Sequence, residues 1–151
     1  MGNYINNNAY GELESTSKHL IFSVNGCVCA INVALVCKIA ELSNISPLQQ
    51  AEPYILGLTE ADGEVYPVAD LRIFFGADKK SLPASKHAVL LANEKSKVYV
   101  VVDEVISIID IKVKPSACLF NKNPCISGII KTDDRNIILL SNENLLSLLK
   151  V

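Results

Sequence analysis

The sequence predicts a mainly β protein made of two similar small barrels of about five strands each, with a few short helices. The apolar runs are short, rich in Val and Ile and separated by turn-forming residues, which is typical of barrels and sandwiches. Half of the 151 residues are hydrophobic and a fifth are charged, so the chain can bury a substantial core. Residues 55–75 also align without a gap with residues 126–146, which indicates that the second half repeats the plan of the first.

The chain is expected to fold as one domain behind a short leader. Residues 1–17 are rich in Asn, Gly, Ser and Thr without periodicity, which favours a flexible leader. Residues 18–151 then form the domain, with halves at roughly 29–87 and 88–140 and with the terminal segments packing across them.

The first hairpin has a strand over residues 19–24 and a return strand over 27–31. Asn25-Gly26 separates them and supplies the positive φ angles of a two-residue turn. After it, apolar residues recur at a spacing that favours a short helical turn leading into another strand: Val33, Val36 and Ile39.

A second hairpin has Asp62-Gly63 as its turn. Pro67 must lie at a strand end, an edge or a bulge of this hairpin, because it has no N–H to donate. Asp70 is suited to cap a short helix that Gly76 closes. Asp70 together with Arg72 favours a structural ion pair over a catalytic acid and its partner.

After a polar loop over residues 77–86, the second half predicts more strands and a closing helix over residues 145–149. Three runs are nearly continuous β-branched sequence, which favours strands with little solvent-facing surface: 89–92, 98–102 and 105–109. Residues 93–96 supply the turn between the first two of these strands.

Charge and hydropathy exclude two classes of partner. The formal net charge is -2 and the lysines and arginines are scattered, so no basic stripe is present to bind nucleic acid. The N-terminus lacks the cationic start and apolar core of a secretory signal, and no apolar run approaches the ~20 residues that span a bilayer. We therefore expect a cytoplasmic protein with no direct membrane insertion.

The side chains that could carry chemistry do not form a catalytic or metal-binding set. Five cysteines, an odd number without an export signal, are expected as reduced thiols: Cys27, Cys29, Cys37, Cys118 and Cys125. Cys27-x-Cys29 has no second Cys/His pair at zinc-finger spacing, and His19 and His87 are expected at the surface beside strands. The sequence thus predicts no enzyme, no metal and no cofactor. A cysteine-dependent enzyme using Cys27 or Cys37 is the least supported alternative.

Two segments, residues 54–58 (Tyr-Ile-Leu-Gly-Leu) and 63–72 (Gly-Glu-Val-Tyr-Pro-Val-Ala-Asp-Leu-Arg), resemble the signature of CheW-like domains. In that signature an apolar-Gly-apolar strand leads through a turn to a strand and helix with the pattern Val-Pro-Val-x-Asp-Leu-Arg. The resemblance extends from the Phe22 strand to the closing helix. It implies two five-stranded SH3-like barrels side by side, which agrees with the internal repeat.

The resemblance also implies a function. Domains of this family link the cytoplasmic tips of chemoreceptors to the regulatory domain of a CheA-type histidine kinase, and they have no chemistry of their own. We therefore expect a non-catalytic adaptor with partner-binding residues near the barrel seam: Val36, Lys38, Ile39, Leu56, Gly57, Leu58 and Asp62. Gly57 is included because a glycine within a strand lets another group approach closely. Structural roles are expected for Gly63, Pro67, Asp70, Arg72 and Gly128.

Three residues depart from the usual family pattern. Asp62 replaces an arginine, Lys38 replaces a commonly acidic residue, and Ser141 replaces an aspartate of the second half. The charges at two candidate contact positions are therefore inverted, which would repel an ordinary partner. Either the partners are complementary variants, or the chain is a divergent CheW-like interaction module of another signalling or motility pathway.

Overall fold

The computed structural model describes residues 15–113 and 123–149, which form two five-stranded sheets and two short helices. Sheet A contains β1 (Ser15–Val24), β2 (Cys27–Asn32), β8 (Glu104–Val113), β9 (Ile126–Lys131) and β10 (Asn136–Leu140). Sheet B contains β3 (Val36–Glu41), β4 (Ile55–Ala61), β5 (Glu64–Asp70), β6 (His87–Ala92) and β7 (Lys97–Val101). The helices are α1 (Leu71–Phe74) and α2 (Asn142–Leu148), and the 3₁₀ turns are η2 (Val33–Leu35) and η3 (Lys79–Ser81). The predicted β-rich fold is confirmed, whereas Cys118 and most of the predicted leader lie outside the described residues.

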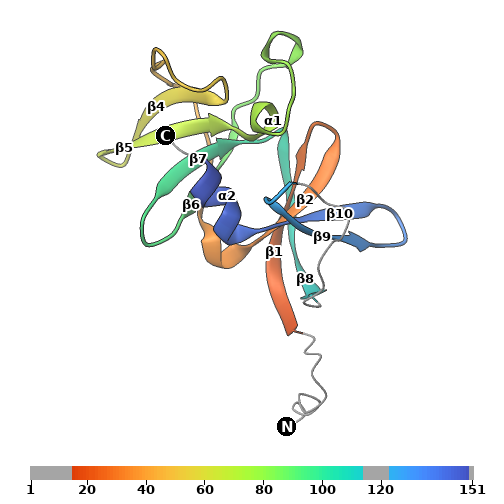
Figure 1. Cartoon of the computed structure of the whole chain (residues 1–151). Helices are drawn as coiled ribbons and strands as arrows, with labels where there is room; N and C mark the ends of the chain where they lie inside the picture. The colour runs from red at the N-terminus through yellow and green to blue at the C-terminus, as the bar shows by residue number, and fades with distance from the viewer. Residues whose placement is uncertain (1–14, 114–122, 150–151) are drawn as a thin grey trace.

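The two halves of the chain exchange strands. Each half runs through five strands and a helix in the same order, β1 to β5 then α1 and β6 to β10 then α2, which confirms the predicted repeat. The strand order is β8-β1-β2-β10-β9 in sheet A and β3-β6-β7-β5-β4 in sheet B. The first two strands of each half therefore join the last three of the other half. The joining pairs are the parallel pairs β2–β10 and β5–β7 and the antiparallel pairs β1–β8 and β3–β6. Figure 1 shows this exchange as red and orange strands lying beside blue ones.

The sheets divide the chain differently from the predicted halves, which meet at residue 88. Sheet B uses strands between residues 36 and 101, and it thus includes β6 and β7 from the second half. A repeat in the sequence marks two copies of one plan, but it carries no information on which copy a strand pairs with. β1 also begins inside the predicted leader, at Ser15, where it pairs with Val113 of β8.

Both predicted hairpin turns are confirmed. Asn25 and Gly26 have φ angles of 54° and 79°, and Asp62 and Gly63 have φ angles of 53° and 80°. Positive φ at both central residues gives a two-residue turn the twist of the strands that it joins. Pro67 lies in β5 just before Val68, where pairing with β7 begins, so its missing N–H falls outside that ladder.

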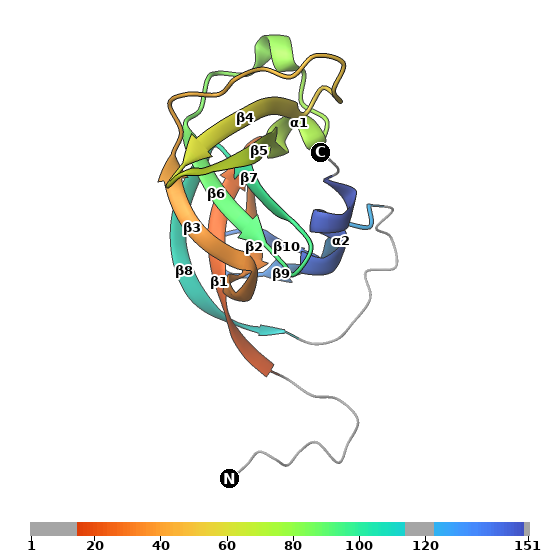
Figure 2. The ribbon, with the colours of Figure 1, turned by 90° about the vertical axis from the view of Figure 1, so that its left-hand side faces the viewer.

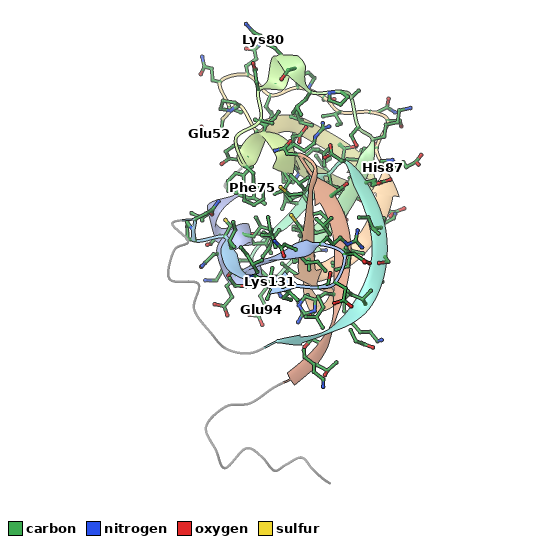
Figure 3. All side chains as sticks on the ribbon, turned by 90° about the vertical axis from the view of Figure 1, so that its right-hand side faces the viewer. Glu52, Phe75, Lys80, His87, Glu94 and Lys131 are labelled. Carbon is green, nitrogen blue, oxygen red and sulfur yellow. The ribbon has the colours of Figure 1, made fainter. Side chains whose placement is uncertain are left out.

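A shared apolar cluster joins the two sheets into one domain. It contains residues of sheet A, sheet B and α2, among them Phe22, Ile31, Val89, Val100 and Leu145. Because side chains alternate along a strand, the neighbouring residues fill a second cluster in each sheet: Ile21, Ala30 and Ile137 in sheet A, and Leu90, Tyr99 and Val101 in sheet B. Figure 3 shows Phe75, which packs against the shared cluster, in the middle of the molecule, whereas Lys80 extends from its outer end.

A polar network also ties sheet A to sheet B. Asp70 accepts a hydrogen bond from the Arg72 backbone N–H at 2.9 Å and two from its guanidinium at 3.0 and 2.8 Å, which confirms the predicted cap and ion pair. Arg72 also donates to the Pro83 carbonyl oxygen at 2.8 Å and to Asp103 at 3.2 Å. Asn25, in the β1–β2 turn, donates its backbone N–H to Asp103 and its side-chain amide to the Arg72 carbonyl oxygen. The buried Asp70–Arg72 pair is therefore surrounded by further hydrogen bonds, which offset the cost of burying its charges.

Two predictions about burial are wrong. The β-branched run at 105–109 predicts a buried strand, but Ile106, Ile108 and Ile109 are 39%, 55% and 38% exposed. The reason is that β8 is an edge strand of sheet A, and Figure 2 shows it along the outer side of the molecule. His19, predicted at the surface, is 3% exposed within β1, whereas His87 is exposed at the start of β6.

None of the described helices has the length and apolar character needed to cross a membrane.

Candidate partner-binding surface

The predicted partner-binding residues lie on β3, on β4 and in the β4–β5 turn. β3 and β4 are the two edge strands of sheet B. We call the following set the β3/β4 surface: Val36, Lys38, Ile39, Leu56, Gly57, Leu58 and Asp62. Within it, Lys38, Ile39 and Asp62 are exposed. Val36, Leu56 and Leu58 are half-buried, and Gly57 is buried.

The two residues with inverted charges are paired with each other. Lys38 Nζ donates a hydrogen bond to Asp62 Oδ2 at 2.9 Å, and the two side chains remain 46% and 77% exposed. Asp62 raises the pKa of Lys38 above its ordinary value, through this hydrogen bond first and through its charge second. The pair thus joins one edge strand of sheet B to the turn that follows the other edge strand. β3 and β4 stand at opposite ends of the strand order of sheet B, so the pair links these two edge regions through side chains.

Two tyrosines lie close to this ion pair. The rings of Tyr66 and Tyr99 meet edge to face, with centroids 5.3 Å apart and planes at 88°. A hydrogen bond with Glu64 is the largest cause that raises the pKa of Tyr66, followed by burial. Among the described residues, Glu60, Asp62 and Glu64 do not form a group of three side chains that could hold a metal ion. The acidic turn is therefore a solvated surface carrying one neutralising lysine.

Gly57 is held against the chain's own backbone. Its φ angle is 144°, and a Cβ built there would overlap with the carbonyl oxygen of Ser46. Ser46 and Leu58 exchange two backbone hydrogen bonds at 2.8 and 2.9 Å, and Thr59 Oγ1 donates to the Asn44 carbonyl oxygen at 2.7 Å. The close approach expected at Gly57 is thus made by the segment that precedes β4. At Gly128, its counterpart in the repeat, a Cβ would meet no described atom within 4 Å.

The apolar members of the surface differ in how far they are covered. Ile39 is 47% exposed, whereas Val36 packs against the shared cluster and Leu56 against the cluster inside sheet B. Val65, which the sequence interpretation missed, is 62% exposed and pairs with Glu60 across the hairpin. Strand alternation could have found it, because Val65 lies one residue before the buried Tyr66.

Ser141 caps the start of α2. Its side-chain oxygen accepts a hydrogen bond from the Asn144 backbone N–H at 3.3 Å and caps α2. Serine and aspartate are both favoured at this position, because each offers an oxygen to the free N–H groups of the first turn. This departure from the family pattern therefore leaves the helix start intact.

The comparisons with known proteins agree with this architecture. The chain is 28% identical over 134 residues to the chemotaxis protein CheW of Bacillus subtilis (strain 168), covering 84% of this chain and 86% of that protein. It is 27% identical over 140 residues to the chemotaxis protein CheW of Rhizobium meliloti (strain 1021), covering 88% and 90%. The crystal structure of the scaffolding protein TtCheW from Thermoanaerobacter tengcongensis superposes with a TM-score of 0.74 at 23% identity, covering 84% of this chain and 90% of that one.

That structural match confirms the predicted pair of SH3-like barrels. The family model of the CheW-like domain matches residues 18–150, which include α2 and both sheets except the first three residues of β1. The chain therefore belongs to the CheW-like domain family.

Proposed function

We propose that this protein is a non-catalytic scaffold that couples the cytoplasmic tips of chemoreceptors to the regulatory domain of a CheA-type histidine kinase. The observation that carries the proposal is the CheW-like match over residues 18–150, together with curated relatives named as chemotaxis proteins that align over most of their length. A protein with this function works through its surface, and the β3/β4 surface offers exposed apolar and charged groups on a braced edge.

The Lys38–Asp62 pair favours this function over the divergent module. Two unpaired inverted charges would each repel a partner built for the usual signs. Here the two inversions compensate inside the chain, because Lys38 and Asp62 neutralise each other. A partner therefore meets an ion pair of reversed direction rather than two isolated charges. We assign the contact to the exposed residues Lys38, Ile39 and Asp62. The more buried residues Val36, Leu56, Gly57 and Leu58 hold these three in place.

Calorimetric titration tests the proposal. The purified protein is titrated with the kinase regulatory domain and with the receptor tip from the same organism, at moderate salt. We expect saturable binding to both, with Kd values of tens of micromolar or tighter, on the order of −6 kcal/mol or more of binding free energy. Binding to neither would contradict the coupling function and assign the chain to another signalling pathway.

A pair of variants tests the surface itself. Ile39→Glu places a charge on the exposed β3 edge and should weaken binding to at least one partner. Leu148→Glu is the matched control, because Leu148 is also a partly exposed apolar residue, at 39%, but lies on α2. Equal losses in the two variants would contradict a contact at β3.

A further inference from the structure

Two thiols line one largely apolar pocket on sheet A. The pocket has a volume of about 250 Å³ and is lined by the β1–β2 hairpin, by β9 and β10, and by Phe75, which follows α1 and is labelled in Figure 3. Both Cys27 and Cys29 are part of this lining, and none of the described lining residues is charged. The described lining contains no residue of the β3/β4 surface, so the proposed function leaves the pocket without a role.

The register of β2 places both thiols on the same face of the sheet. Cys27 pairs with Val24 and Cys29 pairs with Phe22 in a ladder without a bulge. Side chains two residues apart on a strand point to the same side, and Cys29 packs in the shared cluster, so Cys27 faces that side too. Cys29 is 3% exposed, whereas Cys27 is exposed. Burial raises the pKa of Cys29, and the charge of the neighbouring Cys27 raises it further. The pocket therefore has one buried thiol and one accessible thiol.

The spacing of the two thiols decides what can bridge them. Cα atoms two residues apart on a strand are separated by roughly 6.6 Å, whereas disulfides favour about 5.5–6 Å. A metal ion between the sulfurs replaces one bond by two and therefore spans the wider gap more easily. Structural zinc requires four ligands, but no group of three metal-ligating side chains occurs among residues 15–113 and 123–149. A soft monovalent cation such as Cu(I) prefers thiolates and is satisfied by two of them in a linear arrangement.

We propose that Cys27 and Cys29 bind one Cu(I) ion as a two-coordinate dithiolate in this pocket. Each thiol releases its proton to the solvent and donates a sulfur lone pair, and the copper remains Cu(I) throughout. A metal ion deprotonates a thiol that coordinates it, so the unfavourable burial of a free Cys29 thiolate does not prevent binding. The apolar side chains of Phe75 and Ile138 in the lining offer no competing ligand, which favours the linear geometry.

Anaerobic titration of the reduced whole protein with Cu(I), in competition with the coloured chelator bicinchoninate, tests the proposal. We expect the protein to take one equivalent of Cu(I) from the chelator, and X-ray absorption of that complex to show two sulfur neighbours. The midpoint of thermal unfolding should rise, because an ion that prefers the native state over the unfolded chain stabilises the native state. Failure to compete with the chelator would overturn the proposal. An unchanged midpoint would also overturn it, because the folded pocket would then add nothing to the affinity of the free thiols.

Three variants localise the copper. Cys27→Ser changes an exposed residue and should lower the Cu(I) affinity at least about a hundredfold, because even groups that only orient a metal ligand contribute 10–100-fold. Cys29→Ala removes the buried ligand and should have a similar effect. Cys37→Ser removes the other exposed thiol of the described residues and is the matched control, which should keep the affinity and the rise in the unfolding midpoint. If Cys29→Ala fails to fold, Cys27→Ser decides alone. An unchanged affinity in Cys27→Ser, or an equal loss in Cys37→Ser, overturns the proposal.

Discussion

Lys38 and Asp62, the two residues whose charges are opposite to the usual family pattern, form one ion pair with an Nζ–Oδ2 distance of 2.9 Å. The pair connects β3 to the turn after β4 and thereby braces the open edge of sheet B. An inversion at one of these positions alone would place like charges side by side. With both charges inverted the ion pair is kept, and only the positions of its positive and negative partners are exchanged.

The first prediction is that charge reversal in this pair is compensated. Lys38→Glu and Asp62→Arg should each lower the midpoint of thermal unfolding by about 1–3 °C, a small effect because both side chains are largely exposed. The double variant should recover most of the loss, since it restores an ion pair of the usual family direction. Circular dichroism measures the midpoints, and a double variant whose loss equals the sum of the single losses would show that the pair does not couple.

The second prediction concerns the seam network. Asp70→Ala leaves the Arg72 guanidinium buried without its bidentate partner, and we expect it to lower the free energy of unfolding by about 3–5 kcal/mol. Asp110→Ala removes the exposed pair with Lys18 and should cost no more than about 0.5 kcal/mol. Urea denaturation measures both. Similar losses would contradict the structural role of the network.

The third prediction compares two glycines at equivalent places in the repeat. Gly57→Ala combines a strained φ angle with an overlap against the Ser46 backbone, so it should destabilise the protein by about 2–3 kcal/mol. Gly128→Ala meets open space and should change the stability by less than about 1 kcal/mol. Equal effects on the free energy of unfolding would show that the Ser46 contact is not what requires glycine.

The fourth prediction concerns the four described thiols. Burial raises the pKa of Cys29 to about 12 and also raises that of Cys125, whereas Cys27 and Cys37 are exposed. Iodoacetamide at about pH 8 should therefore modify Cys27 and Cys37 in the native protein, and Cys29 and Cys125 only after unfolding, because the thiolate is the reactive species. Peptide mass spectrometry identifies the sites. Rapid alkylation of Cys29 in the native state would contradict this assignment and favour a reactive-cysteine function.

Local sequence signals predict the turns and caps of this fold well. Asn25-Gly26, Asp62-Gly63 and the Asp70 cap each depend on residues that are adjacent in the chain, so the sequence carries the whole signal. The exposure of β8 could not be predicted, because a run of β-branched residues fits a buried strand and an apolar edge strand equally well.

The candidate surface could be predicted only in part. The sequence identifies Lys38 and Asp62 as unusual, but their contact spans 24 residues and depends on how sheet B closes. It also gives no sign that Ser46 is the group that approaches Gly57, since the segment before β4 has no regular pattern. Pairings between distant segments are set by the tertiary fold, whereas turns and caps are set locally.

The exchange of strands between the halves imposes an order on folding during synthesis. Sheet B has all of its strands once β7 has left the ribosome, whereas sheet A waits for β10, which inserts beside β2. Until then the β1–β2 hairpin exposes apolar residues such as Ile21 and Ala30, which pack with Ile137 of β10 in the finished protein. Such distant pairing slows folding and leaves an early hairpin prone to association. A nascent chain stalled between β7 and β10 should therefore be the species that most needs a chaperone.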